Sequence, residues 1–149
     1  MSENLISKFQ MKAYSVDHFS YTCPAQIEAK EINHRFDGEY NVDYFDDQWY
    51  GAIILDYHAA TNATEPSDRL SVEMIMHAVF SYNDENTETA KEQFIRFLKA
   101  NGAVSLFSIM RGHIATATTS LGMRPGLVMP SINLRNFVWK TDLPSNPNP

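Results

Sequence analysis

The clearest pattern along the chain is an alternation of apolar and mixed positions between Leu70 and Tyr82. Even-numbered positions there carry only apolar side chains, and this period of two is typical of a β-strand with one buried face. The segment from Gln48 to Thr61 also alternates, is rich in aromatic and β-branched residues and lacks proline, which predicts a second strand. Turn-forming residues fill positions 62–69, so we predict that the two strands form an antiparallel hairpin.

Two weaker patterns precede this hairpin. Residues from Lys8 to Tyr21 alternate imperfectly, and those from Asp37 to Tyr44 form a shorter extended segment after a polar connection. We predict a strand in each segment, which places four strands in the first half of the chain.

The period becomes helical in the second half of the chain. Thr89 followed by Glu92 matches a capping box, which predicts a helix over about residues 88–101. Asn101-Gly102 offers the left-handed residue that commonly ends a helix, and a second helix is predicted over 104–121. Strands followed by helices indicate an α+β fold with a four-stranded antiparallel sheet.

Composition narrows the class of protein. A chain of 149 residues with 44% hydrophobic side chains suits one domain over 1–149, with flexible tails expected at 1–7 and 141–149. The net charge of −6 argues against nucleic acid as a partner, and no apolar run is long enough for membrane insertion. The single Cys23 cannot form an internal disulfide, and without a signal-peptide pattern we expect a cytoplasmic protein.

Candidate catalytic and metal-binding residues are few. The five histidines show no ligand spacing with one another or with Cys23, so we expect no metal site. Asp56 and His58 share a predicted strand face and His77 could lie opposite them, but this trio lacks a nucleophile. The chain also lacks a glycine-rich phosphate loop. We therefore expect no catalytic residue and no cofactor, and keep an enzyme built on this trio as an alternative.

Aromatic side chains gather around the start of the strand at Gln48. We predict that they line an apolar groove for extended polypeptide, closed by a methionine-bearing part of the second helix that can adapt to varied partners. The groove residues are Tyr44, Phe45, Trp49, Tyr50, Leu106, Phe107 and Met110. The alternative that the aromatic side chains only pack the sheet against the helices stays open.

Several local sequences lie in the first strand, the fourth strand, the second helix and the exit from that helix. The strand positions are Phe9-Gln10-Met11-Lys12, Asp17-His18-Phe19-Ser20-Tyr21, Pro24 and Arg69 to Phe80. The helix and exit positions are Leu106-Phe107, Arg111, Ile114, Gly122, Pro125, Leu127, Ile132 and Asn133. In this order they resemble the SecB export chaperones, over about residues 9–134.

The resemblance implies two helices on one side of the four-stranded sheet and a homo-oligomer, either a dimer or a dimer of dimers. It also implies an ATP-independent chaperone that holds unfolded or extended polypeptide, or one dedicated client protein, in apolar grooves. The apolar arc of the first helix is wider than one sheet face requires, which indicates a contact with another subunit. That arc contains Phe94, Ile95, Phe97 and Leu98.

The sequence departs from the export chaperones at the acidic sheet face that docks the SecA motor. Glu73 persists there, whereas His18 and Thr22 stand near the end of the first strand, which argues against SecA docking. Glu73 and Asp17 remain candidate residues for docking another partner. Residues 1–60 hold ten acidic and four basic side chains, and the alternative to a chaperone is an adaptor that binds one partner through an acidic face.

Overall fold

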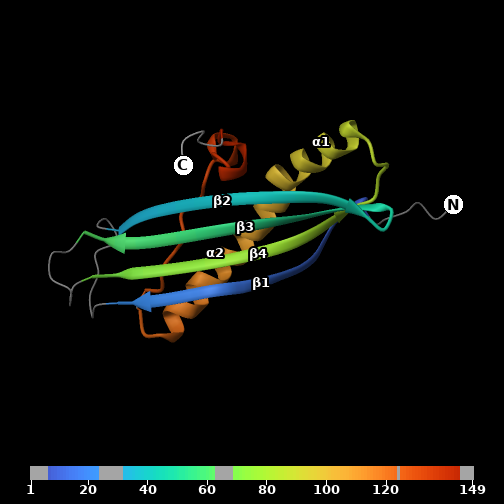
Figure 1. Cartoon of the computed structure of the whole chain (residues 1–149). Coiled ribbons are helices and arrows are strands. Elements are labelled where there is room, and N and C mark those ends of the chain that lie inside the picture. Colours follow the sequence, from blue (N-terminus) through green and yellow to red (C-terminus); the bar gives the residue numbers. More distant parts are fainter. Residues whose placement is uncertain (1–6, 24–31, 63–68, 124, 145–149) are drawn as a thin grey trace.

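The computed structural model shows a four-stranded antiparallel sheet with helices on one of its faces (Figure 1). It describes residues 7–23, 32–62, 69–123 and 125–144. Its strands are paired in the order β1-β4-β3-β2. They are β1 (Phe9–Thr22), β2 (Ile32–Phe45), β3 (Gln48–Thr61) and β4 (Ser71–Tyr82). The expected α+β fold and the antiparallel pairing of β3 with β4 are confirmed, and positions 63–68 of the expected turn lie outside the described residues.

One face of the central strands is buried, as their alternation predicts. Cross-strand pairs such as Ile53 with Ala78 and Leu55 with Met76 point toward the helices and are fully buried. On the opposite face Ile54 is only half-buried. Because successive strand residues point to opposite faces, this register fixes which side chains form the core.

The helical part runs without a loop from α1 (Glu88–Phe97) through a π-helical segment, η3 (Leu98–Gly102), into α2 (Ala103–Ser120) (Figure 1). The predicted cap at Thr89 is wrong, because the side chain of Thr87 accepts the hydrogen bond from the Ala90 N–H at 3.1 Å. Thr87 stands directly before Glu88, the first residue of the helix, which is the position of an N-cap.

The predicted helix end at Asn101-Gly102 is also wrong. Gly102 has a right-handed φ of −64°, so the helix continues through it. A Cβ atom at this position would lie 3.0 Å from Cδ1 of Ile53, so the glycine allows the helix to approach the sheet closely. Gly102 therefore serves packing and does not end the helix.

After α2 the chain crosses the helix-covered face of the sheet and reaches the outer side of β2 (Figure 1). It includes two short 3₁₀ turns, η4 (Leu134–Asn136) and η5 (Lys140–Asp142). Thr141 lies at the start of the expected flexible tail, and its hydroxyl bonds to the backbone of Tyr40. Residues 1–6 and 145–149 of the expected tails lie outside the described part of the chain.

Candidate functional site

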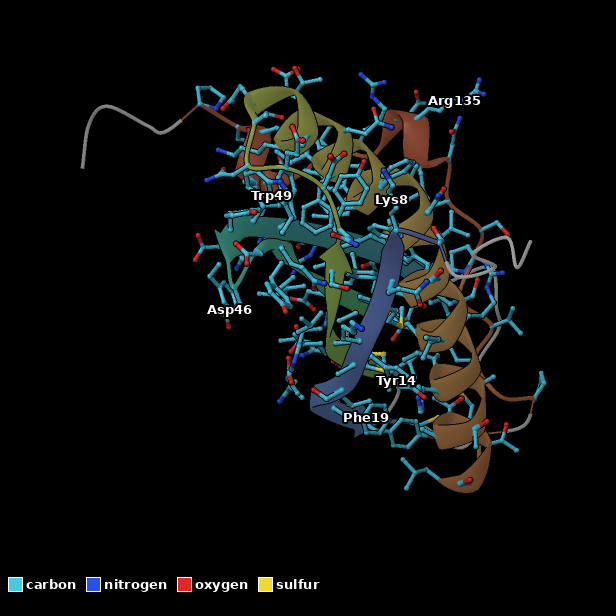
Figure 2. The ribbon with its side chains drawn as sticks, turned by 90° about the vertical axis from the view of Figure 1, so that its right-hand side faces the viewer. Lys8, Tyr14, Phe19, Asp46, Trp49 and Arg135 are labelled. Carbon is cyan, nitrogen blue, oxygen red and sulfur yellow. The ribbon has the colours of Figure 1, made fainter. Side chains whose placement is uncertain are left out.

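The β2–β3 hairpin separates the four aromatic residues of the predicted groove. Tyr44 and Trp49 lie on the helix side, where their rings meet edge to face at 5.1 Å. Phe45 and Tyr50 lie on the opposite face, stacked at 4.3 Å. Figure 2 shows Trp49 beneath α1 and Asp46 at the tip of the hairpin. Neighbouring strand residues point to opposite faces, so these four side chains cannot line one groove.

The remaining residues of the predicted groove are packed inside the chain. Leu106, Phe107 and Met110 are buried against the sheet. Trp49 is buried too, and its indole N–H donates to the carbonyl oxygen of Glu85 at 2.9 Å. For these residues the structure shows the packing role that the sequence left open. A role in polypeptide binding stays a prediction for them.

A different groove lies between the first half of β2 and the C-terminal segment. Its volume is about 550 Å³. Apolar side chains make most of its wall, together with two asparagines and one residue of each charge. The lining residues are Phe36, Asp37, Ile132, Asn133, Asn136, Phe137, Val138, Lys140 and Leu143.

Aromatic rings build the base of this groove. Phe36 and Phe137 each meet the ring of Phe107 edge to face, at 5.9 Å in both cases. The Phe137 ring also lies against the backbone of Gly38, where a Cβ atom would stand 2.8 Å from its Cε1 atom. The absence of a side chain at Gly38 therefore lets the C-terminal segment approach β2 closely. On the rim, Val138 and Leu143 are more than half exposed.

The groove borders an edge of the sheet, because β2 is the last strand in the strand order. The backbone N–H of Tyr40 donates to the hydroxyl of Thr141 at 3.0 Å, and the same hydroxyl donates to the Tyr40 carbonyl oxygen at 3.0 Å. Both backbone groups of Tyr40 therefore point away from β3. By the alternation of an antiparallel ladder, those of Phe36 and Gly38 point the same way.

Charged side chains hold the C-terminal segment near Tyr40. The Asp142 carboxylate accepts hydrogen bonds from the Tyr40 hydroxyl and from Nζ of Lys99, which also lies 5.1 Å from the centre of the Tyr40 ring. Burial and the bond to Asp142 raise the pKa of Tyr40 to about 12. Burial acts to raise the pKa of Asp142, but the bonds from Lys99 and Tyr40 outweigh it and lower the pKa below its usual value.

The two predicted acidic residues lie on the sheet face opposite the helices. Asp17 accepts from the ring of His77 at 2.7 Å, and this hydrogen bond lowers the pKa of the Asp17 carboxyl. Glu73 lies 3.3 Å from the ring of His18. Nearby, burial and the charge of Glu73 raise the pKa of Asp56. Each predicted docking residue is therefore already engaged by a histidine of the same face.

The enzyme-like trio does not come together as one site. His77 bonds to Asp17 on β1, and His58 contacts the hydroxyl of Ser71 at 3.5 Å. In the register of β3 and β4, the residue opposite Asp56 is Ile75, so Asp56 does not pair across the strands with His58 or His77. No group of three or more potential metal-ligating residues forms within residues 7–23, 32–62, 69–123 and 125–144.

Sequence reasoning missed the groove because its second wall is irregular. Phe36 precedes the strand predicted from Asp37, and the residues that follow the second predicted helix carry no repeating apolar pattern. One usable signal was present: Phe137 and Trp139 are two residues apart, the spacing that places both rings on one side of an extended chain. That signal does not identify β2 as the strand they pack against.

No family model matches this chain. No curated protein matches it either. Among solved structures, it is similar to the Mycobacterium tuberculosis SecB-like chaperone Rv1957 in complex with a ChAD peptide from the HigA1 antitoxin. The two share 17% sequence identity with a TM-score of 0.57, over 84% of this chain and 91% of that chain. The chain therefore has a SecB-like fold, as the resemblance in its sequence implied. No helix in the part that the structure describes is long and apolar enough to cross a membrane.

Proposed function

We propose that this protein is a SecB-like chaperone that binds unfolded or extended polypeptide in the groove between β2 and the C-terminal segment. The observation that carries the proposal is an apolar groove directly beside the outer edge of a sheet. An extended segment can bond to edge backbone groups while alternate side chains enter an apolar pocket. The fold shared with a chaperone whose structure contains a bound antitoxin peptide supports this proposal.

The chemistry of the groove favours segments rich in apolar side chains. Its base is aromatic, and Asp37 and Lys140 contribute opposite charges at its wall. Backbone bonding tolerates many sequences, so the same groove suits unfolded chains in general or one dedicated client. SecA docking is not part of the proposal, because the ring of His18 lies 3.3 Å from the carboxylate of Glu73. Glu73 is the acidic residue retained on the sheet face opposite the helices.

Val138→Asp tests the groove with little risk to the fold, since Val138 is 65% exposed. We expect the charge to reduce suppression of aggregation of a reduced, unfolded client severalfold, because an apolar wall becomes charged. The thermal midpoint should stay within about 2 °C of wild type, as for most exposed substitutions.

Val128→Asp is the matched control, because Val128 is 71% exposed and is not among the groove residues. It should protect the client as well as wild type does. Equal protection by Val138→Asp and Val128→Asp would reject this groove, and a wild-type protein without any protection would reject the chaperone function.

A single-partner adaptor is the second candidate function, favoured by the uncovered face of the sheet. Half-buried Ile54, Ile75 and Val79 lie there beside Asp17 and Glu73. Such a protein would give no general protection of unfolded clients. Binding of its partner would be lost in Ile75→Asp and retained in Val138→Asp. The chaperone proposal expects the reverse, with client binding lost in Val138→Asp and retained in Ile75→Asp.

A further inference from the structure

Residues 137–143, named here the C-terminal strap, lie against the part of β2 that adjoins the groove. Phe137 packs on Gly38 and against Phe107. Trp139, two residues later, is 4% exposed and meets the Tyr40 ring edge to face at 5.8 Å. Both strap residues have extended backbone angles, φ −73° and ψ 126° at Phe137 and φ −81° and ψ 130° at Trp139.

The strap thus contacts β2 in the manner expected of a bound polypeptide. Two aromatic side chains at alternate positions fill neighbouring apolar sites, which is how an extended ligand places its side chains. The edge backbone of Tyr40 is engaged as well, but by the hydroxyl of Thr141 acting as both donor and acceptor. A pairing strand cannot use the backbone groups of Tyr40 while Thr141 occupies them.

The contacts that close the strap are ones that a ligand can exchange. Lys99 and Asp142 are 33% and 41% exposed, and exposed ion pairs contribute little to stability. Val138 and Leu143 lie on the rim of the groove and are more than half exposed. The main anchors are the Phe137 and Trp139 rings, and a ligand with two large apolar side chains at the same spacing can replace them.

Resting on the chaperone function proposed above, we propose that the C-terminal strap is an internal substitute for the client. It covers the β2 edge at Tyr40 beside the groove. Extended segments that carry two large apolar side chains two residues apart first bind in the groove against Val138 and then take the places of Phe137 and Trp139. The aromatic side chains of the strap therefore indicate which ligands the site prefers. The strap also reduces the fraction of molecules that are ready to bind a client. The apparent affinity of the protein for a client is therefore the affinity of the open site multiplied by the fraction of molecules in which the strap is open.

The test uses a labelled synthetic peptide with the sequence of residues 131–144, titrated into the full-length protein. Thr141→Val removes both bonds to Tyr40 while keeping the shape of the side chain. We expect this variant to bind the peptide roughly fivefold to thirtyfold more tightly than wild type, the factor that corresponds to losing one or two hydrogen bonds. Asp142→Asn, which weakens the contact with Lys99, should change affinity in the same direction.

Two controls separate strap release from general loosening. Thr116→Val changes an exposed threonine of α2 and should leave peptide affinity at the wild-type value. A peptide in which the residues equivalent to Phe137 and Trp139 are both serine should bind none of the proteins measurably. Binding of this serine peptide with the parent affinity would overturn the ligand class.

Amide hydrogen exchange at Tyr40 gives an independent reading. We expect slow exchange in wild type, fast exchange in Thr141→Val and slow exchange again when the parent peptide is added. Equal peptide affinity in wild type, Thr141→Val and Asp142→Asn would overturn the strap proposal. If the wild type then still protects an unfolded client from aggregation, the chaperone function stands without the strap. If it gives no protection, both proposals are rejected.

Discussion

The hydroxyl of Tyr57 shows how a single exposed residue can satisfy a buried one. Tyr57 is fully buried, and its hydroxyl lies 2.7 Å from Nδ1 of His34. Burial raises the pKa of Tyr57 well above its usual value, so the hydroxyl stays protonated and can donate. Burial lowers the pKa of His34, whose ring stacks on Tyr57, and this favours the neutral imidazole that can accept.

We expect His34→Ala to reduce the free energy of unfolding by about 1–3 kcal/mol, because a buried hydroxyl loses its partner. Urea denaturation of the variant and of wild type measures the difference. Adding Tyr57→Phe to the same chain should recover most of the loss, since it removes the unsatisfied hydroxyl. A stable His34→Ala protein would show that another group already satisfies Tyr57.

At the scale of elements, the continuous helix fits the sheet because glycine is present where the two layers touch. A Cβ atom at Gly51 of β3 would lie 2.9 Å from Cδ1 of Leu98 and from the ring of Phe94. Both of these side chains are fully buried and have little room to move. Gly112 of α2 is the opposite case, because nothing lies within 4 Å of its Cβ position.

These two glycines should therefore respond to alanine with opposite signs. We expect Gly51→Ala to reduce the free energy of unfolding by about 1–3 kcal/mol through overpacking. Gly112→Ala should increase it by about 0.5–1 kcal/mol, because alanine favours the helix and meets no neighbour. Denaturant unfolding of both variants checks the prediction. Changes of the same sign would contradict the close packing of helix and sheet at Gly51.

Sequence reasoning succeeded for elements whose pattern is repetitive. The alternation of apolar side chains predicts β3 and β4 because many residues carry that signal together, and the structure buries every second side chain along both strands. The helix end at Gly102 was misplaced because glycine is used both for helix termination and for close approach, and only the tertiary contact with Ile53 distinguishes the two. The position of the strap could not be predicted from the sequence, because it depends on single contacts between segments far apart in the chain, such as that of Thr141 with Tyr40.

At the scale of the whole molecule, the two edges of the sheet differ. The strap covers part of β2, whereas β1 presents Tyr14 and Val16, which are 49% and 41% exposed. Figure 2 shows Tyr14 between β1 and α2, and its ring lies 6.2 Å from that of His113. An exposed edge strand with apolar side chains favours pairing with another chain. The apolar arc of α1 is a weaker candidate than expected, because Phe97 packs inside the chain against Phe9.

We therefore expect a homo-oligomer that associates through β1. Light scattering at concentrations on the order of tens of micromolar should give a mass of at least two chains for wild type. Val16→Lys should shift the protein toward a monomer, because a charge on an edge strand opposes pairing with another edge. Val128→Lys also adds a charge at an exposed valine but leaves β1 unchanged, so it should keep the wild-type mass. A monomeric wild type would contradict self-association, and an oligomeric Val16→Lys protein would place the contact away from β1.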